Sequence, residues 1–181
     1  MRTYAFVFGA LILTTLAAAQ VRLPRLISNG MILQRDVPVN VWGWATPKEK
    51  VSIRMDQETW DVQADDQGNW LLSLPAHTAG GPHQITFTAS NQIILHDVYF
   101  GEVWLCSGQS NMELMMDRVK DKYPEVIATA DNSYIRQFTV PDEYDFKAER
   151  KDYREGSWVP LNRQSIASFS AVAYFFADNL Y

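Results

Sequence analysis

Hydrophobic and polar residues alternate with a period of two along the first half of the chain. Residues 37–44 alternate as a half-buried strand does, and residues 50–55 place Val51, Ile53 and Met55 on one face. The same pattern recurs in residues 60–64, 70–74 and 84–89. Clusters of Gly, Pro, Asp and Asn separate these segments, as is typical of turns. Short strands at this spacing predict an antiparallel β-sandwich over residues 20–97.

The pattern changes after Asp97. Residues 98–106 are mostly apolar, as expected for a strand buried on both faces of a parallel sheet. Helix-forming composition follows over residues 111–120, and a second strand is predicted over residues 134–140. A last helix is predicted to begin near Ser165 or Ser168, with helically spaced apolar residues at Phe169, Val172, Ala173, Phe176 and Leu180. Strand, helix, strand and helix predict the start of an α/β domain over residues 98–181.

That second domain is expected to be truncated. Two strands with two or three helices cannot cover both faces of a parallel sheet. The last helix also runs into Tyr181 without a stop signal behind it. We therefore expect this chain to be the N-terminal part of a longer protein.

The first nineteen residues resemble an export signal. Arg2 supplies a positive charge, residues 4–16 are apolar, and Ala17-Ala18-Ala19 provides the small residues that a signal peptidase requires. The apolar stretch is short for a bilayer span, although an uncleaved anchor is the alternative. We predict cleavage before Gln20, no membrane association afterwards, and a periplasmic or extracellular location.

Amino-acid composition and net charge limit the classes of partner that the protein is expected to bind. Hydrophobic residues at 47% and charged residues at 20% are typical of a soluble globular domain. The net charge of −5 gives no basic surface for nucleic acid, which is therefore excluded as a partner. The single cysteine, Cys106, follows apolar residues and is predicted to be a buried, inert thiol.

Ser110 is the candidate catalytic residue. It lies at the predicted turn between a buried strand and a helix, where open α/β folds bind ligands. Gly108 lets the backbone turn tightly just before it. Backbone N–H groups at the helix start would stabilise an oxyanion during acyl transfer. Ser110 and Glu113 also fit a capping box, in which the serine satisfies backbone donors and does no chemistry.

The block Gly-Glu-Val-Trp-Leu-Cys-Ser-Gly-Gln-Ser-Asn-Met-Glu at 101–113 is the most distinctive motif of the chain. It resembles the nucleophile block of the sialate O-acetylesterase family of SGNH hydrolases. The resemblance extends through residues 26–35, 41–44, 80–83, 97–98 and 169–177, and so covers nearly all of the chain after the signal. It implies a β-sandwich followed by a flavodoxin-like, three-layer α/β domain.

The resemblance also implies an activity and a site. Ser110 would be the acyl-accepting nucleophile of a carbohydrate O-acetylesterase, with its backbone N–H in the oxyanion hole. Gln109 and Asn111 would line the site, and the substrate would be an O-acetylated sugar. The family's Gln-Gly-Glu and Asp-x-x-His blocks do not occur here, and Ser168 stands where an oxyanion glycine would be sought. Without its base a serine is a weak nucleophile, so the chain alone is expected to be nearly inactive.

The remaining sequence features are interpreted as structural, and no metal or other cofactor is predicted. His77, His83 and His96 lie before the nucleophile strand and are interpreted as ordinary surface or hydrogen-bonded histidines, without the spacing of metal ligands. The acidic segment 65–69 lacks the pattern of a calcium loop and is predicted to be a hairpin turn. The sandwich core is predicted to contain Trp42, Trp44, Trp60 and Trp70. The alternative function is a non-catalytic carbohydrate-binding module built on the sandwich.

Overall fold

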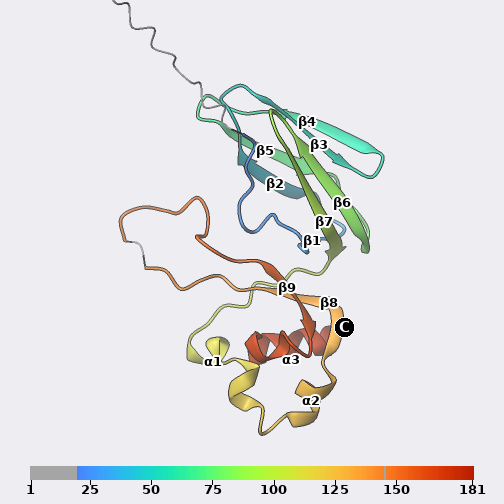
Figure 1. Cartoon of the computed structure of the whole chain (residues 1–181), viewed down its shortest axis with the longest axis vertical. Helices are drawn as coiled ribbons and strands as arrows, with labels where there is room; N and C mark the ends of the chain where they lie inside the picture. The colour runs from blue at the N-terminus through green and yellow to red at the C-terminus, as the bar shows by residue number, and fades with distance from the viewer. Residues whose placement is uncertain (1–19, 145) are drawn as a thin grey trace, which may run out of the picture.

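A computed structural model describes residues 20–144 and 146–181 of the chain. The export signal predicted over residues 1–19 lies outside these described residues. Figure 1 shows strands β1 to β7 gathered at one end of the molecule and helices α1, α2 and α3 at the other, with β8 and β9 between them. The fold therefore has a sheet region, residues 20–101, and a second region, residues 102–181.

The sheet region consists mostly of strands. Their bounds are β1 Ile32–Gln34, β2 Val39–Trp44, β3 Lys50–Met55, β4 Glu58–Gln63, β5 Asn69–Leu74, β6 Gly80–Thr88 and β7 Gln92–Gly101. Five of them form one sheet in the order β1-β7-β6-β3-β4, while β2 pairs with β5 separately. All of these pairs are antiparallel except β1 with β7, which is parallel. The strands predicted from alternation are confirmed in position.

The two sheets share one hydrophobic core. Val51, Ile53 and Phe87 from the larger sheet and Val41 and Leu74 from the smaller are all 0% exposed and belong to the same cluster. The alternation of residues 50–55 therefore has the predicted cause, since every second side chain of β3 enters this core. Each buried side chain of this size contributes about 1.5–3 kcal/mol of transfer free energy.

The tryptophans of the sheet region divide between core and surface. Trp70 is 3% exposed and packs against Phe87 with tilted rings, whose centroids are 5.8 Å apart. Trp42 and Trp60 are partly buried against the same core. Trp44 is instead half-buried under the guanidinium of Arg22, at 5.6 Å from the ring centroid.

The second region mixes short helices with one β-hairpin. Its elements are α1 Ser110–Glu113, the 3₁₀ helix η1 Met116–Val119, α2 Pro124–Thr129, β8 Asp131–Phe138, β9 Trp158–Asn162, the 3₁₀ helix η2 Ile166–Ser168 and α3 Ala171–Leu180. β8 and β9 are antiparallel. A second cluster, centred on Met116, Ile166 and Phe169, packs beneath these elements. The last helix and the strand predicted over residues 134–140 are present, but α3 begins at Ala171 and β8 pairs antiparallel with β9 instead of joining a parallel sheet.

The helix predicted over residues 111–120 is interrupted. Leu114 has an extended conformation, with ψ of 109°, and its carbonyl accepts a hydrogen bond of 2.7 Å from the Ala171 amide. Met115 forms a bridge with Ser170, and the Met116 amide donates to the Phe169 carbonyl at 2.9 Å. This pairing with the segment before α3 draws the chain out of the helix, so α1 ends at Glu113. In the described parts of the chain, no helix is long and apolar enough to cross a membrane.

Candidate active site

The strand predicted over residues 98–106 is only half formed. Val98 and Phe100 belong to β7 and are 0% and 2% exposed, and β7 continues past Asp97 as far as Gly101. Residues 102–108 have no regular structure and are exposed, with Leu105 at 91%. The reason is that no described strand pairs with this segment. The prediction that Cys106 is buried was wrong for the same reason, since its side chain is exposed.

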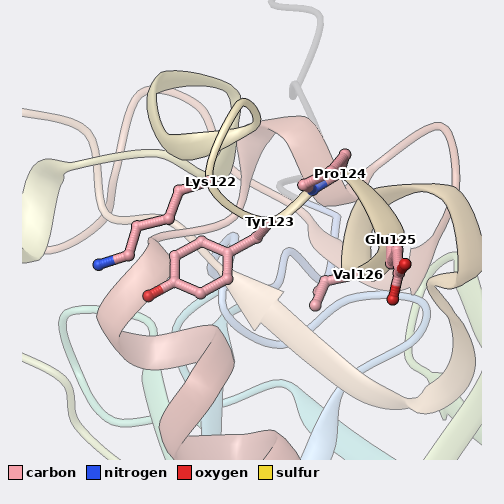
Figure 2. Close-up of a pocket in the computed structure, with 5 residues that line it drawn as sticks. All are labelled: Lys122, Tyr123, Pro124, Glu125 and Val126. Atoms are coloured by element: carbon pink, nitrogen blue, oxygen red, sulfur yellow. The ribbon is translucent and has the colours of Figure 1, made fainter.

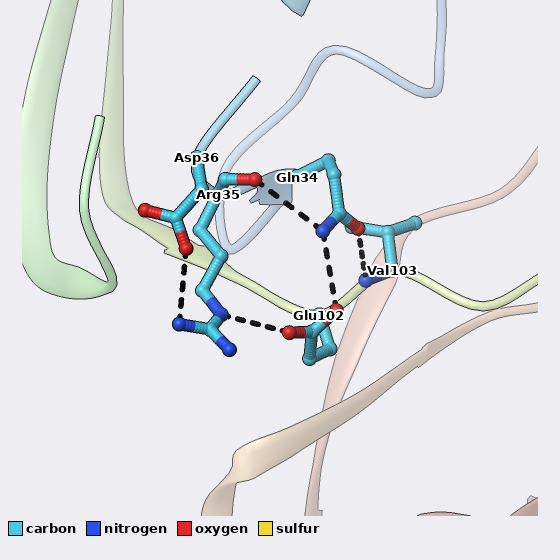
Figure 3. A network of polar contacts seen from close by, with 5 residues as sticks. All are labelled: Gln34, Arg35, Asp36, Glu102 and Val103. Atoms are coloured by element: carbon cyan, nitrogen blue, oxygen red, sulfur yellow. Dashed lines mark hydrogen bonds and ion pairs between the residues drawn. The ribbon is translucent and has the colours of Figure 1, made fainter. Parts of the chain in front are cut away.

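A polar network fixes the beginning of this segment (Figure 3). The Arg35 Nε donates to Glu102 Oε1 at 2.7 Å, and the Gln34 amide nitrogen donates to Glu102 Oε2 at 3.1 Å. The amide of Val103 donates in turn to Gln34 Oε1 at 2.9 Å. The hydrogen bond from Arg35 is the main reason that the pKa of Glu102 lies below its ordinary value. The network joins two of the sequence motifs, residues 26–35 and 101–113, directly.

Ser110 is exposed and is the first residue of α1. The N-cap is Gln109, whose carbonyl accepts hydrogen bonds from the amides of Met112 at 2.8 Å and Glu113 at 3.2 Å. No side chain caps this helix, and the capping box of Ser110 with Glu113 is not formed. Within the described chain, the Ser110 hydroxyl is therefore not engaged in satisfying the helix start.

The flanking residues predicted to line the site, Gln109 and Asn111, lie on either side of Ser110 at the same end of α1. Gln109 is exposed and Asn111 is exposed as well. Gly108 precedes them, and a Cβ atom at this position would lie 3.2 Å from Cβ of Met112, tighter than most such contacts. The structure thus brings Gln109, Ser110 and Asn111 together on one exposed turn.

The turn before α3 consists of residues 168–171. None of its backbone amides is free to donate to an oxyanion. The amide of Ser168 donates to the Ser165 carbonyl at 3.0 Å, and that of Phe169 donates to the Ile166 carbonyl at 3.1 Å. The Ser170 amide donates to the Gln137 side chain at 2.9 Å, and the Ala171 amide donates to the Leu114 carbonyl. By contrast, the Ser110 amide has no acceptor among the described residues. This turn supports α1 and, in this arrangement, contributes no oxyanion donor.

The three histidines lie in the sheet region, as predicted. His83 Nδ1 is 2.8 Å from the Asp56 carboxylate, and the backbone amide of His96 donates to the Asn29 side chain at 2.8 Å. His77 packs against Phe100 with tilted rings, whose centroids are 4.6 Å apart. Each has its contacts there, and none pairs with Ser110. In the described parts of the chain, no cluster of His, Cys, Asp and Glu could hold a metal ion.

The segment predicted to be a hairpin turn instead connects the two sheets. Asp65 Oδ1 accepts hydrogen bonds from the amides of Gln67 and Asn69, both at 2.8 Å. Because β4 and β5 belong to different sheets, the turn joins strands that are not paired. The side-chain hydrogen bond from Asn69 is the largest cause of the lowered pKa of Asp65. Asp65 therefore serves the turn, as an acceptor for its backbone.

Two surface pockets lie elsewhere. One, of about 300 Å³, is a crevice between Lys122, Tyr123, Pro124, Glu125 and Val126 at the start of α2 (Figure 2). The other, of about 290 Å³, is lined by Pro24, Leu26, Trp42 and residues 150–153. Ser110 is exposed and lines neither of these two pockets.

Comparison with known proteins identifies relatives of one kind. Sialate O-acetylesterase from Mus musculus is 28% identical over 179 residues, which cover 88% of this chain and 33% of the relative. The Homo sapiens enzyme is 29% identical, with 88% and 34% covered. A solved structure of a carbohydrate acetylesterase from Xanthomonas citri is 35% identical with a TM-score of 0.83, and covers 88% of this chain and 37% of that one. No protein-family model matches the chain.

These comparisons confirm the resemblance predicted from the sequence motifs. The chain is homologous to sialate O-acetylesterases over 88% of its length, and its fold is that of the corresponding part of a carbohydrate acetylesterase. It spans about a third of the length of the curated relatives that it matches.

Proposed function

We propose that this homologue of the sialate O-acetylesterases is the N-terminal part of an esterase that removes acetyl groups from sugar hydroxyls, with Ser110 as its nucleophile. One observation carries the assignment of the residue. Ser110 is an exposed serine at the start of α1 whose hydroxyl is not used as a cap, inside the motif that carries the resemblance to these esterases. A serine kept only for helix capping would be expected to bond the helix start.

The proposed reaction is a two-step acyl transfer. Ser110 Oγ attacks the acetyl carbonyl carbon while a general base takes its proton, and the resulting oxyanion is held by the Ser110 backbone N–H. The bond from the acetyl carbon to the sugar oxygen then breaks, and the sugar oxygen takes up a proton. Water attacks acetyl-Ser110, which releases acetate and restores the hydroxyl. Gln109 and Asn111 flank Ser110 and would contact the acetylated sugar.

The general base and its carboxylate are proposed to come from outside this chain. The histidines present have contacts in the sheet region and none with Ser110. Around the site, large apolar side chains are exposed: Trp104 at 59%, Leu105 at 91% and Phe176 at 41%. We propose that further strands and helices of an SGNH-type α/β domain cover these side chains and supply the base. The isolated chain is therefore proposed to be nearly inactive.

The sheet region is proposed to be the β-sandwich of such an esterase, because its two sheets share one core. Export to the periplasm or the extracellular space is proposed from residues 1–19. N-terminal sequencing of the mature protein from the natural host should begin at Gln20, whereas an intact Met1 would contradict the proposed cleavage.

Acetate release tests the esterase assignment. The complete protein should hydrolyse O-acetylated sialic acid or acetylated xylan, and Ser110→Ala should lower kcat about 10³-fold or more. Ser157→Ala is the matched control, because Ser157 is an exposed serine outside the proposed site. If Ser110→Ala retains wild-type activity, Ser110 is not the nucleophile. If the complete protein binds acetylated sugars without hydrolysing them, the alternative of a carbohydrate-binding module is correct.

A further inference from the structure

Two neighbouring residues of β8 connect the proposed site to the sheet region. Consecutive side chains of a strand point to opposite faces, so Arg136 and Gln137 reach different parts of the molecule. The Arg136 side chain is only 2% exposed and its Nη1 donates to the carbonyls of Gly30 and Asp97, both at 2.8 Å. The Asp97 carboxylate lies 3.0 Å from the same nitrogen. β8 is thereby attached to the sheet region.

Gln137 reaches the turn before α3. Its Oε1 accepts a hydrogen bond of 2.9 Å from the Ser170 amide, and its Nε2 donates to the Ser168 carbonyl at 3.3 Å. Nε2 also donates to Thr139 Oγ1 at 2.7 Å. One amide group thus satisfies a backbone donor and a backbone acceptor of the same turn. A primary amide does this with both of its ends, which a carboxylate cannot do because it only accepts.

The turn at residues 168–171 also contacts the segment that carries Ser110. Ser170 Oγ lies 3.5 Å from Met112 Sδ, and the amide of Ala171 donates to the Leu114 carbonyl at 2.7 Å. The amide of Met116 donates to the Phe169 carbonyl at 2.9 Å. These contacts hold the chain from residue 112 onward, within α1 and directly after it. α1 has only four residues and no side-chain cap, so its own hydrogen bonds do little to fix its position.

We propose that Gln137 is a positioning residue, whose side-chain amide holds the turn at Ser168–Ser170 and thereby sets the place of Ser110 relative to the catalytic base. The inference rests on the proposed function. It concerns geometry only, because Gln137 does not contact the proposed nucleophile. Small displacements of a nucleophile cost rate far more than they cost substrate affinity, and about 1 Å can lower a rate about 100-fold.

The test is steady-state hydrolysis of p-nitrophenyl acetate by the complete protein and its variants. Gln137→Ala should lower kcat about 10- to 100-fold while KM stays within about twofold. Gln164→Ala, which changes an exposed glutamine near the same turn, should behave as wild type. The midpoint of thermal unfolding is measured for each variant, so that a loss of rate from unfolding is recognised.

Gln137→Glu keeps the size of the side chain and decides the matter if the alanine variant does not fold. The groups that bond the Gln137 amide are hydroxyls and backbone atoms of Thr139, Ser168 and Ser170, so none of them titrates. In the Gln137→Glu variant, the ionised carboxylate can no longer donate to the Ser168 carbonyl, whereas the protonated carboxyl can. The activity of Gln137→Glu relative to wild type should therefore be low at neutral pH and should rise below about pH 5.

The outcomes separate the two proposals. Wild-type kcat in both folded Gln137 variants, with Ser110→Ala inactive, would overturn the positioning role and leave the esterase assignment intact. If the activity of Gln137→Glu relative to wild type does not change with pH, the proposed role of the Gln137 side-chain amide is also contradicted. An inactive wild type would overturn the proposed function, and this inference with it.

Discussion

The two regions of the molecule differ in how completely they bury their apolar side chains. In the sheet region, Val41, Ile53, Leu74 and Phe87 are all 0% exposed, and the strands of both sheets are paired. In the second region, Trp104, Leu105 and Phe176 remain exposed beside a smaller buried cluster. The first region therefore has a fully enclosed hydrophobic core. The second carries the proposed nucleophile on a framework that leaves apolar surface open.

The comparison explains why the proposed nucleophile depends on its neighbours. α1 has no side-chain cap, and residues 102–108 have no paired strand among the described residues. The segment that carries Ser110 is instead anchored at its two ends, by the hydrogen bonds of Gln34 and Arg35 to Glu102 and by the contacts of the turn at residues 168–171 with Leu114 and Met116. The site is therefore positioned by contacts between segments distant in sequence.

The largest expected difference in stability lies between the two cores. Phe87→Ala removes a fully buried ring from the sheet region and should lower the free energy of unfolding by about 3–5 kcal/mol. Phe169→Ala, in the smaller cluster, should cost less because nearby surface is open and the site can collapse. Urea denaturation of residues 20–181 measures both. An equal or larger loss from Phe169→Ala would contradict the comparison.

Within residues 20–181, the contacts of Arg136 between the two regions should be the next most sensitive place. Arg136→Met removes the donor to the carbonyls of Gly30 and Asp97 and should destabilise the chain by about 2–3 kcal/mol. Arg136→Lys keeps the charge but loses the fork of donors, and should recover only part of this loss. Arg163→Met is the control, because Arg163 is exposed. Unfolding midpoints of Arg136→Met equal to those of the control would show that stability does not depend on these contacts.

Trp104 should behave differently in the chain and in the complete protein. In residues 20–181 its ring is 59% exposed and contacts Phe176, at 5.2 Å between centroids, so Trp104→Ala should change the unfolding free energy by about 1 kcal/mol or less. In the complete protein the same change should cost about 3–5 kcal/mol, since the ring is proposed to be covered there. Equal small losses in both would contradict a covered surface.

The smallest effect is expected from Glu102 and depends on pH. Its pKa is lowered in the folded chain, mainly by the hydrogen bond from Arg35, so its contribution is present above the unfolded pKa of about 4.3. That contribution is lost as the pH falls through the lower, folded value. Glu102→Gln should be slightly less stable than wild type at pH 7, and the two midpoints should converge at acidic pH. A constant difference between them would exclude this origin.

The sequence predicted those elements whose side chains alone decide their structure. Alternation placed β3 and β5 because each strand has one face in the core, and helical spacing placed α3. β9 was missed, since Pro160 argues against a strand and the pairing with β8 is a long-range contact. The exposure of Cys106 and the break at Leu114 also depend on contacts, present or absent, with distant segments.

The sequence motif predicted the candidate site residues, but it did not predict the residues that contact this segment from other elements. Gln109, Ser110 and Asn111 follow one another in sequence and were predicted together. Gln137 and Glu102 make their contacts with other elements, at separations that periodicity cannot detect. Two motifs of the resemblance, residues 26–35 and 101–113, were the one available signal that these segments meet.

Covalent labelling of Ser110 tests the central claim most directly. The complete protein is treated with a fluorophosphonate, which modifies activated serines, and the modified peptide is identified by mass spectrometry. We expect modification at Ser110, none in Ser110→Ala, and protection by an O-acetylated sugar. Modification that persists in Ser110→Ala, or that falls on another serine, would contradict the assignment of Ser110 as the nucleophile.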